Sequence, residues 1–282
     1  GDVVTCDFDG VFTKSLRSVH NDMKDETVTS FSYHSKSESI FTTSQNLQFR
    51  VWKDDQVQVS WKASAHRTPA SSCAFDPSGT LVATGGSDRN VFVWDSRKGH
   101  CTHSFKGHTG VVSYVRFHPD ARRLLLFTCS DDTTIRVWDL VAHKCVAVLS
   151  SHMSVVTSLS FSTDGYTMLS AGRDKIVNVY ELRTYGLEKT IPMFESVEAI
   201  EVMRDEKQKR LSFVTAGEKG IVRNWTLSRA SKAEKYSCKQ DSSEETTSSS
   251  QKPYIALLRK DNDELVGITN HHIFKFLDSE TL

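Results

Sequence analysis

The sequence predicts an all-β protein built from repeated antiparallel units of short strands, and three observations lead to that fold class. Segments such as Ile135–Asp139, which alternate apolar and polar residues and end in an aromatic, recur at intervals of roughly 40–50 residues. Turn formers, for example 76–79 (Asp-Pro-Ser-Gly), separate these segments. The segment 155–161 carries apolar or β-branched residues at every second position, as a half-buried strand does. Together they predict a β-propeller in which each repeat forms one blade.

The aromatic that closes each repeat sets the number of blades. Seven equivalent positions can be aligned on it, with a cysteine in the first: Cys6, Trp52, Trp94, Trp138, Tyr180, Trp225 and Phe276. The sequence therefore predicts a seven-bladed propeller. We expect the first blade to be incomplete at the N-terminus, since its first two strands would precede Gly1. The expected blades are residues 1–24, 25–64, 65–106, 107–150, 151–193, 194–240 and 241–282.

The run 107–139 carries the motif that defines the repeat. It opens with Gly107-His108, places an aspartate at 132 in a hairpin turn, and ends with Trp138-Asp139. This arrangement resembles the WD40 repeat, and the resemblance covers nearly the whole chain. In that family a histidine, a strand hydroxyl, a turn aspartate and a tryptophan form one hydrogen-bonded network. A buried polar network is costly unless every member is satisfied, so we expect it to fix strand register.

The resemblance places this network in three consecutive repeats. Two sets are complete, and in a third a tyrosine takes the aromatic place: His66, Thr84, Asp88 and Trp94; His108, Thr128, Asp132 and Trp138; His152, Ser170, Asp174 and Tyr180. The repeats that end in Trp52, Trp225 and Phe276 are expected to lack the network.

Composition narrows the function classes. Lys plus Arg and Asp plus Glu both number 35, so the formal net charge is zero, which argues against a protein whose overall field holds nucleic acid. The six cysteines include no C-x-x-C pair, and this usage fits a reducing compartment. No apolar run approaches the ~18–20 residues of a membrane span. No cofactor, metal, membrane or small-molecule substrate is expected.

Enzymatic function is weighed against a binding scaffold. The sequence contains no Gly-rich phosphate loop and no G-x-S-x-G elbow. The evenly spaced His–Asp pairs are accounted for by the network. We therefore expect a non-enzymatic scaffold rather than a propeller enzyme. The Ser/Thr-rich stretch 229–252 is expected to be a flexible loop.

A closer resemblance points to the cell biology. The segments 101–108, 124–127, 168–176 and 191–198 resemble the first propeller of the tandem-propeller WD40 scaffolds of the small-subunit processome. This implies one part of a longer protein that sits in the nucleolus and supports processing of the ribosomal RNA precursor. The implied partners are other proteins of a large ribonucleoprotein assembly, other propeller scaffolds among them, with the RNA held indirectly.

A second function class stays open. Substrate receptors of cullin-type ubiquitin ligases resemble this chain in a Trp-Asp-x-Arg motif, here Trp94-Asp95-Ser96-Arg97. If the chain is a scaffold, partners are expected at the segments that lead into each blade. That places partner-binding residues just after the Gly-His position or its substitute, at Arg67, Thr109, Met153 and Glu195.

Overall fold

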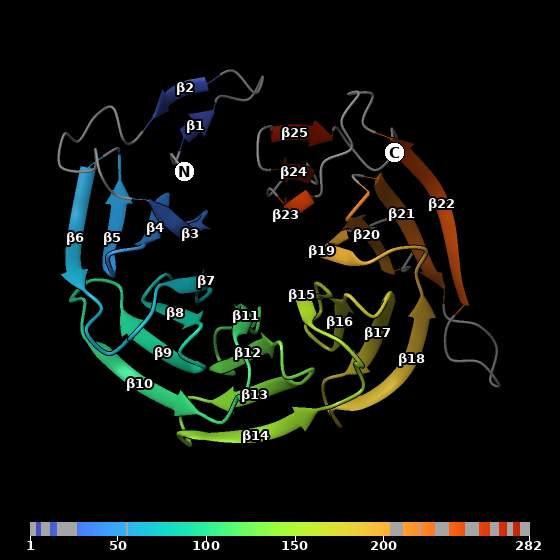
Figure 1. Cartoon of the computed structure of the whole chain (residues 1–282), viewed down its shortest axis with the longest axis horizontal. Helices are drawn as coiled ribbons and strands as arrows, with labels where there is room; N and C mark the ends of the chain where they lie inside the picture. Colours follow the sequence, from blue (N-terminus) through green and yellow to red (C-terminus); the bar gives the residue numbers. More distant parts are fainter. Residues whose placement is uncertain are drawn as a thin grey trace. The chain divides into compact units, whose positions relative to one another are not determined.

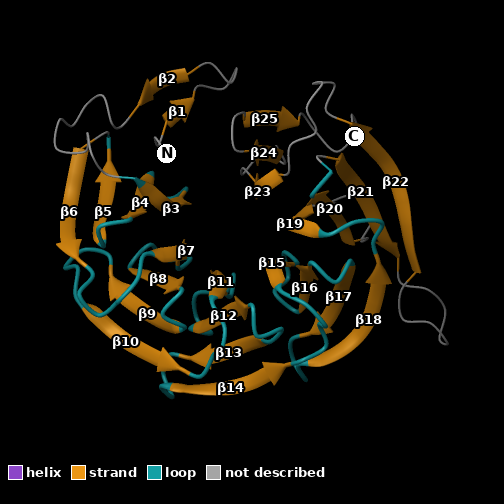
Figure 2. Ribbon diagram, viewed as in Figure 1, coloured by secondary structure: helices purple, strands orange, loops and turns teal. Residues whose placement is uncertain are grey.

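The structure, a computed structural model, describes residues 4–6, 12–15, 27–54, 56–203, 211–219, 221–228, 237–245, 254–259, 265–269 and 273–276. These residues form strands and connecting loops, without a helix (Figure 2). The described part of the chain accordingly holds no helix that could cross a membrane. The predicted all-β class is confirmed.

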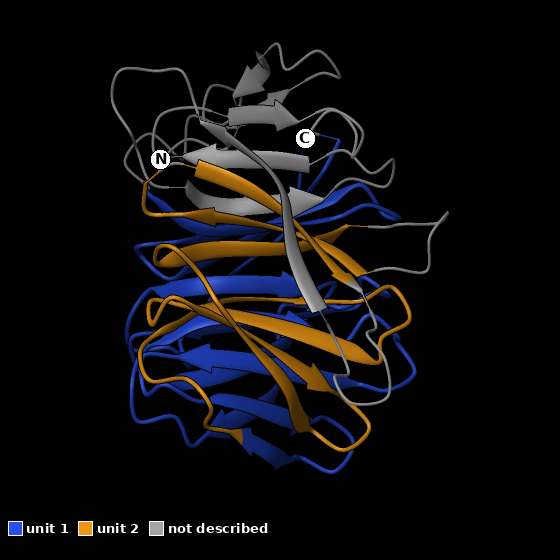
Figure 3. Ribbon diagram, turned by 90° about the vertical axis from the view of Figure 1, so that its right-hand side faces the viewer, with its two compact units in different colours: residues 1–148 blue, residues 149–282 orange. Residues whose placement is uncertain are grey.

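The chain divides into two compact units, residues 1–148 and 149–282 (Figure 3). The sheets of the first unit are antiparallel, and neighbours along the chain are neighbours in the sheet (Figure 1). Their strands are β1 (Val4–Cys6) and β2 (Phe12–Ser15); β3 (Val28–His34), β4 (Ser39–Ser44), β5 (Gln48–Lys53) and β6 (Gln56–Lys62); β7 (Ala70–Phe75), β8 (Leu81–Gly86), β9 (Asn90–Asp95) and β10 (Cys101–Lys106); β11 (Val112–Phe117), β12 (Leu125–Ser130), β13 (Ile135–Asp139) and β14 (Lys144–Leu149), whose last residue opens the second unit.

The second unit repeats the same antiparallel order. Its strands are β15 (Val156–Phe161), β16 (Thr167–Gly172), β17 (Ile176–Glu181) and β18 (Gly186–Pro192); β19 (Val197–Met203), β20 (Leu211–Gly217), β21 (Ile221–Ser228) and β22 (Ser237–Glu245); β23 (Tyr254–Arg259), β24 (Leu265–Thr269) and β25 (Ile273–Phe276). Repeated four-stranded antiparallel sheets are the architecture of propeller blades. The number of blades in a closed ring stays a prediction.

The turn between the second and third strand is built alike in several sheets. Non-glycine residues with positive φ occupy the same place in four of these turns: Leu47, Arg89, Thr133 and Lys175, with φ of 65°, 63°, 68° and 62°. Left-handed backbone is unfavourable for such residues, so something must hold it. In the β8–β9 turn Asp88 Oδ1 accepts the Asn90 amide at 3.1 Å, and in the β12–β13 turn Asp132 Oδ1 accepts the Thr134 amide at 3.0 Å. The aspartate side chain therefore stabilises the tight turn.

Serine and threonine side chains join neighbouring sheets within each unit. In the first unit Ser32 Oγ accepts the Phe75 amide at 3.1 Å, and Ser72 Oγ accepts the Val115 amide at 3.1 Å. In the second unit Ser160 Oγ accepts the Val202 amide at 3.0 Å. The first strands of adjacent sheets are thus hydrogen-bonded through side chains rather than through a backbone ladder.

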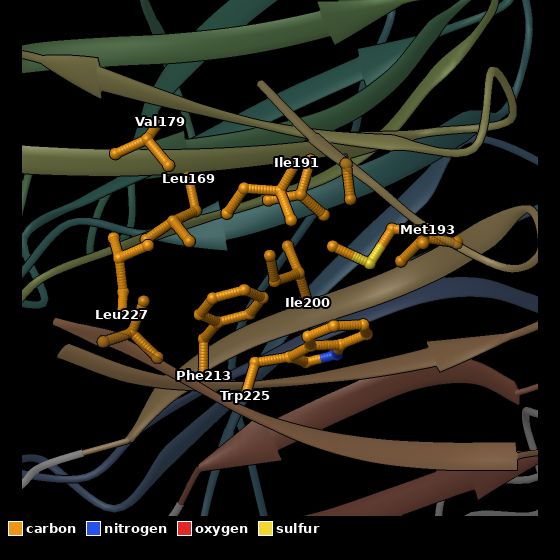
Figure 4. Packing of buried hydrophobic residues seen from close by; sticks show 12 residues of the cluster. Leu169, Val179, Ile191, Met193, Ile200, Phe213, Trp225 and Leu227 are labelled. Carbon is orange, nitrogen blue, oxygen red and sulfur yellow. The ribbon is translucent and has the colours of Figure 1, made fainter. Parts of the chain in front are cut away.

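Apolar side chains fill the space between sheets. In the first unit the Trp138 ring stacks on Phe105 of the preceding sheet, with ring centroids 5.0 Å apart. In the second unit Phe213 and Trp225 stack at 6.2 Å, within a cluster that also contains Val179 of the preceding sheet (Figure 4). Each large aromatic therefore packs where two sheets meet.

The expected alternation of residues 155–161 is interrupted. The register between β15 and β16 shifts between Val156 and Ser158, so one residue is inserted as a bulge. Val156 is consequently buried, whereas Val155 and Thr157 are only half-buried.

Two expectations about the C-terminal part need correction. Residues 237–245, within the stretch 229–252 expected to be a flexible loop, form β22, which pairs with β21 from Ser228↔Ser237 to Ile221↔Glu245. The expected blade boundary between 240 and 241 consequently falls inside a strand. The fourth strand of a blade has one free edge, so a Ser/Thr-rich sequence can occupy it. Residues 229–236 and 246–252 lie outside the described residues.

Candidate functional site

The first network joins a linker histidine to two strands and a turn. A linker is defined here as the segment between the last strand of one sheet and the first strand of the next. Trp94 Nε1 donates to Thr84 Oγ1 at 2.8 Å, and Thr84 Oγ1 lies 2.8 Å from His66 Nε2. His66 Nδ1 lies 2.8 Å from Asp88 Oδ2. The structure therefore brings together all four residues that the sequence grouped.

The second network has the same geometry in the sheet β11–β14. Trp138 Nε1 donates to Thr128 Oγ1 at 2.8 Å, which lies 2.7 Å from His108 Nε2. His108 Nδ1 lies 2.9 Å from Asp132 Oδ2. The hydrogen-bonded network runs from the Trp138 indole to the Asp132 carboxylate without a break.

The direction of the hydrogen bonds follows from their chemistry. An indole N–H can only donate, so Thr128 Oγ1 accepts from Trp138, and its own proton is available to His108 Nε2. The histidine then carries its proton on Nδ1 and donates it to Asp132. These directions correspond to a neutral imidazole between a hydroxyl and a carboxylate.

Titration behaviour agrees with this assignment. Burial lowers the pKa of the His108 imidazole, against the opposing effect of the Asp132 carboxylate. Burial alone would raise the pKa of the Asp132 carboxyl, but hydrogen bonds from Thr134, Thr109 and His108 hold that pKa well below its usual range. The pair therefore consists of a neutral imidazole and an ionised carboxylate.

The third network keeps the histidine half and changes the aromatic half. His152 Nε2 lies 2.6 Å from Ser170 Oγ, and His152 Nδ1 lies 2.9 Å from Asp174 Oδ2. Tyr180 is buried, and its hydroxyl accepts a long 3.5 Å bond from Asn178 Nδ2. Tyrosine has no indole N–H, so it cannot form the indole bond of the first two networks.

Two further sheets retain half of a network that was expected to be absent. Trp52 Nε1 donates to Thr42 Oγ1 at 2.9 Å, and Trp225 Nε1 donates to Thr215 Oγ1 at 2.9 Å. The expectation that these repeats lack the network is therefore wrong for the Trp–Thr bond. Phe276 lies in β25, and its side chain is outside what the structure describes.

Glu195 was expected to face partners, and the structure overturns that expectation. Glu195 is 4% exposed and accepts the Lys219 amide at 2.8 Å. Its carboxylate also forms an ion pair with the Arg223 guanidinium. Glu195 stands 24 residues before Lys219, the same separation as His108 from Asp132. Glu195 therefore occupies the histidine place itself. The sequence analysis had assigned it to the position that follows the histidine place.

The pair Glu195–Arg223 was not found from the sequence. The only available signal was a basic residue two positions before Trp225 together with an acidic residue in the preceding linker. Nothing in the repeat pattern predicts that these side chains exchange for a His–Asp pair.

The other linker residues present their side chains to solvent. Arg67, Thr109 and Met153 are exposed, while their backbone amides donate to the network aspartates at 3.1, 2.9 and 2.9 Å. Their backbone is thus fixed and their side chains are free to bind. Arg97 is also exposed, in the β9–β10 turn, where its amide is held by Asp95 Oδ1 at 2.9 Å.

The network is built to hold the fold rather than to react. Each histidine nitrogen already lies within 3 Å of a hydroxyl or a carboxylate, as the distances above record, and the rings are buried. Among the described residues, no group of three or more His, Cys, Asp or Glu side chains could hold a metal ion. What remains available for recognition is the exposed surface of the linkers and turns.

Sheet order, linker histidines and Trp-Asp ends define the class of protein. The family described as "WD domain, G-beta repeat" matches residues 58–95, 99–139 and 143–181. The chain is a WD40-repeat protein with propeller-type sheets.

Particular relatives narrow the comparison. The chain is 47% identical over 219 residues to transducin beta-like protein 3 of Rattus norvegicus, a match that covers 74% of this chain and 27% of the relative. The human protein of that name is 44% identical over 219 residues, which cover 74% of this chain and 27% of the relative. "U3 small nucleolar RNA-associated protein 13" of Saccharomyces cerevisiae is 30% identical over 218 residues, covering 73% of this chain and 26% of the relative. The chain thus spans about a quarter of the length of these curated relatives.

Proposed function

We propose that the chain is a non-enzymatic scaffold that holds other proteins in a ribosome-biogenesis assembly of the nucleolus, the small-subunit processome. The observation that carries the proposal is the 44–47% identity to transducin beta-like protein 3 over 74% of the chain. The yeast relative supports it, because that protein's name records an association with U3 small nucleolar RNA. In this role the chain supports processing of the ribosomal RNA precursor.

The geometry of the networks supports a scaffold over an enzyme. The histidines that could act as a general base are His66, His108 and His152, and each is buried with both ring nitrogens engaged. A general base must instead reach a substrate proton. We infer that the networks serve to present rigid linkers to partners.

The proposed partners are proteins, with the RNA precursor bound indirectly. The formal net charge is zero, so the chain lacks the overall positive field that draws nucleic acid to a protein. The exposed side chains of Arg67, Thr109 and Met153 stand on backbone fixed by the network aspartates. Backbone that is already fixed loses little entropy on binding, which favours protein recognition.

The proposal is tested by affinity purification of the tagged chain from growing cells, with an unrelated WD40 protein as the control. Recovered proteins are identified by mass spectrometry, and recovered RNA is probed for U3 RNA and the precursor of the small-subunit RNA. We expect both RNAs and other propeller scaffolds to be enriched over the control. Recovery of neither RNA from a folded, nucleolar chain would contradict the proposal.

A ubiquitin-ligase receptor is the second candidate, favoured by one observation. In the motif Trp94–Arg97, Ser96 is buried and donates to Gly79 O at 2.8 Å, whereas the Arg97 side chain is exposed. The motif therefore offers one guanidinium to a partner. Under this function Arg97→Ala removes a cullin adaptor from the purified chain while Lys98→Ala keeps it. If neither variant changes the recovered proteins and no cullin is present, this candidate is eliminated.

A further inference from the structure

One strand position lies beside the linker in several sheets, namely the position two residues before the closing aromatic. Asn178 holds this position in β17, where its Nδ2 donates to Ser151 O at 3.4 Å. Arg223 holds it in β21, where the guanidinium lies 5.7 Å from the centre of the Phe194 ring. Arg136 is the equivalent residue in β13. The side chain at this position therefore meets the linker residue that precedes the histidine place.

Arg136 follows this pattern and lies against Gly107. A Cβ atom added at Gly107 would lie 2.7 Å from Arg136 Nη1 and 3.1 Å from the Trp138 ring. Burial chiefly lowers the pKa of the neighbouring His108, and the positive charge of Arg136 adds to that effect. The guanidinium therefore lies beside both the linker and the Trp138 ring, where it fits because Gly107 has no side chain.

In the described part of the chain, the Arg136 guanidinium has no acceptor, and its Nε is buried without a hydrogen bond. The Asp132 carboxylate of the adjacent network forms no ion pair with Arg136. Its oxygens accept instead from His108, the Thr109 amide and Thr134. Arginine cannot release its proton, and a charged donor without a partner is costly to bury. Arg136 is only half-buried, so a group from outside can reach its side chain.

The equivalent arginine of the second unit shows which group this position takes. Arg223 forms an ion pair with the carboxylate of Glu195, which stands at the histidine place of its linker. In the linker beside Arg136 that place holds His108, whose ring is bonded to Asp132. The described chain therefore supplies a carboxylate to one of the two arginines and none to the other.

We propose that Arg136 binds a carboxylate side chain of a partner protein, as Arg223 binds that of Glu195. The proposal rests on the proposed scaffold function and names a group that its partner supplies. A guanidinium matches a carboxylate in geometry and can donate two parallel hydrogen bonds to it. Arginine is also enriched among the residues that carry most of the binding energy at protein interfaces. The position beside the linker and the Trp138 ring favours a planar carboxylate over the bulkier phosphate of a nucleic acid.

The test follows the Nε–H signal of Arg136 by NMR in the whole chain, and the signal is identified by its loss in Arg136→Lys. The probes, titrated at constant ionic strength, are the α-amide of N-acetylglutamate, its neutral glutamine counterpart and inorganic phosphate. We expect the glutamate probe to shift the Arg136 signal in a saturable way and the glutamine probe to leave it in place. Half-saturation should occur at a concentration at least about tenfold lower than at the exposed Arg97, because a partly buried charge is screened less by solvent and salt.

The same chain supplies a matched control and a variant that keeps the charge. Arg223 already holds Glu195, so its Nε–H signal is expected to stay in place. Gly107→Ala displaces the guanidinium and should weaken the glutamate probe at Arg136 by about tenfold or more, the loss of one charge-assisted hydrogen bond. Ala65 stands at the equivalent place of another linker, so alanine is compatible with the fold there. If Gly107→Ala does not fold, Arg136→Gln replaces it, and the Gly107 amide, which reports the probe in the wild type, should no longer shift.

Several outcomes of the titration would overturn the proposal. They are the absence of a saturable shift at Arg136, an equal shift by the glutamine probe, an unchanged affinity in Gly107→Ala, and tighter binding of phosphate, which would assign the position to a phosphate ligand.

Purification from cells then connects the carboxylate to a partner. Arg136→Gln is expected to lose at least one protein that the wild-type chain recovers, and retention of every protein would contradict a partner carboxylate. Probe binding that fails while the wild-type chain still recovers U3 RNA removes the Arg136 site and leaves the scaffold function standing. Probe binding that succeeds without recovery of U3 RNA removes the assembly and keeps the site.

Discussion

Trp138 donates its indole N–H to the hydroxyl of Thr128 at 2.8 Å, and this bond recurs where the rest of the network has changed. The same Trp–Thr bond is present in three further sheets: Trp52–Thr42, Trp94–Thr84 and Trp225–Thr215. The other half of the network is a pair of ionisable side chains, in contrast. This pair is His–Asp in three of the described sheets and Glu–Arg in one. The indole bond thus persists in two sheets that lack the His–Asp pair, whereas the sheet β15–β18 keeps the His–Asp pair and has Tyr180 in place of the tryptophan.

Removal of the Trp138 ring tests the packing role of the aromatic. Trp138 is 2% exposed and stacks on Phe105. We expect Trp138→Ala to lower the free energy of unfolding by about 3–5 kcal/mol. Trp138→Phe, which keeps a ring and loses the N–H donor, should cost less. Urea unfolding measures both, and equal midpoints for the wild type and Trp138→Ala would refute the packing role.

Removal of the Asp132 carboxylate tests the polar network. Its oxygens accept from His108, from the Thr109 amide and from Thr134. Asp132→Ala leaves the buried His108 Nδ1–H without an acceptor, at a cost of about 1–3 kcal/mol. Asp131→Ala is the control, because Asp131 is the exposed neighbour in the same turn. A thermal midpoint that falls equally in both variants would indicate a general effect of the turn.

Acid should destabilise the fold in two steps. Burial keeps the pKa of His108 and His152 below the ordinary 6.5, so the unfolded chain binds protons more readily and stability falls as pH drops through about 6.5. The pKa of Asp88 and Asp132 also lies below the ordinary 3.8, so their stabilising contribution is present above that value and is lost below it. Both effects have the same sign.

The unfolding free energy measured from about pH 7.5 to about pH 5 isolates the histidine step. We expect it to decrease toward acid, and to decrease less in His108→Gln, which has no titrating imidazole. A free energy that rises toward acid would reverse the assigned direction of both histidine shifts.

The Glu195–Arg223 pair should be costlier to break than to replace. Both side chains are largely buried, at 4% and 12% exposure. Glu195→Leu leaves a buried guanidinium unpaired and should cost about 3–5 kcal/mol. The double variant Glu195→Leu and Arg223→Met should be more stable than this single variant. A double variant that loses the sum of both single losses would show that the two side chains do not act as a pair.

Much of the fold could be predicted because the residues that define each repeat lie close together in the sequence. The repeat spacing identified the strands, and the resemblance to the WD40 repeat implied that Thr128 is the hydroxyl partner of the Trp138 indole. The burial of Val156 in place of Val155 could not be predicted, since a bulge depends on pairing with a distant strand. β22 was missed for a similar reason, because its Ser/Thr-rich sequence lacks apolar alternation and its pairing with β21 decides its structure.

The site was predictable where it followed the repeat and unpredictable where it departed from it. The three His–Asp pairs were grouped through the resemblance to the WD40 repeat, whose spacing the sequence follows at these positions. Glu195 was placed among the partner-binding residues because the alignment of its linker was off by one position. The error followed from Phe194, whose large ring stands where the other linkers have a small residue. Only the contacts with Arg223 and the Lys219 amide reveal which residue took the histidine place.

The central claim is that the chain serves a ribosome-biogenesis assembly, and one measurement tests it most directly. The protein is depleted from cells, and precursors of the small-subunit ribosomal RNA are measured with and without re-expression of the wild-type protein. We predict that depletion causes unprocessed precursor to accumulate and that re-expression restores processing. Normal precursor levels after depletion, with accumulation of a ubiquitin-ligase substrate instead, would contradict the claim and favour the receptor function of Arg97.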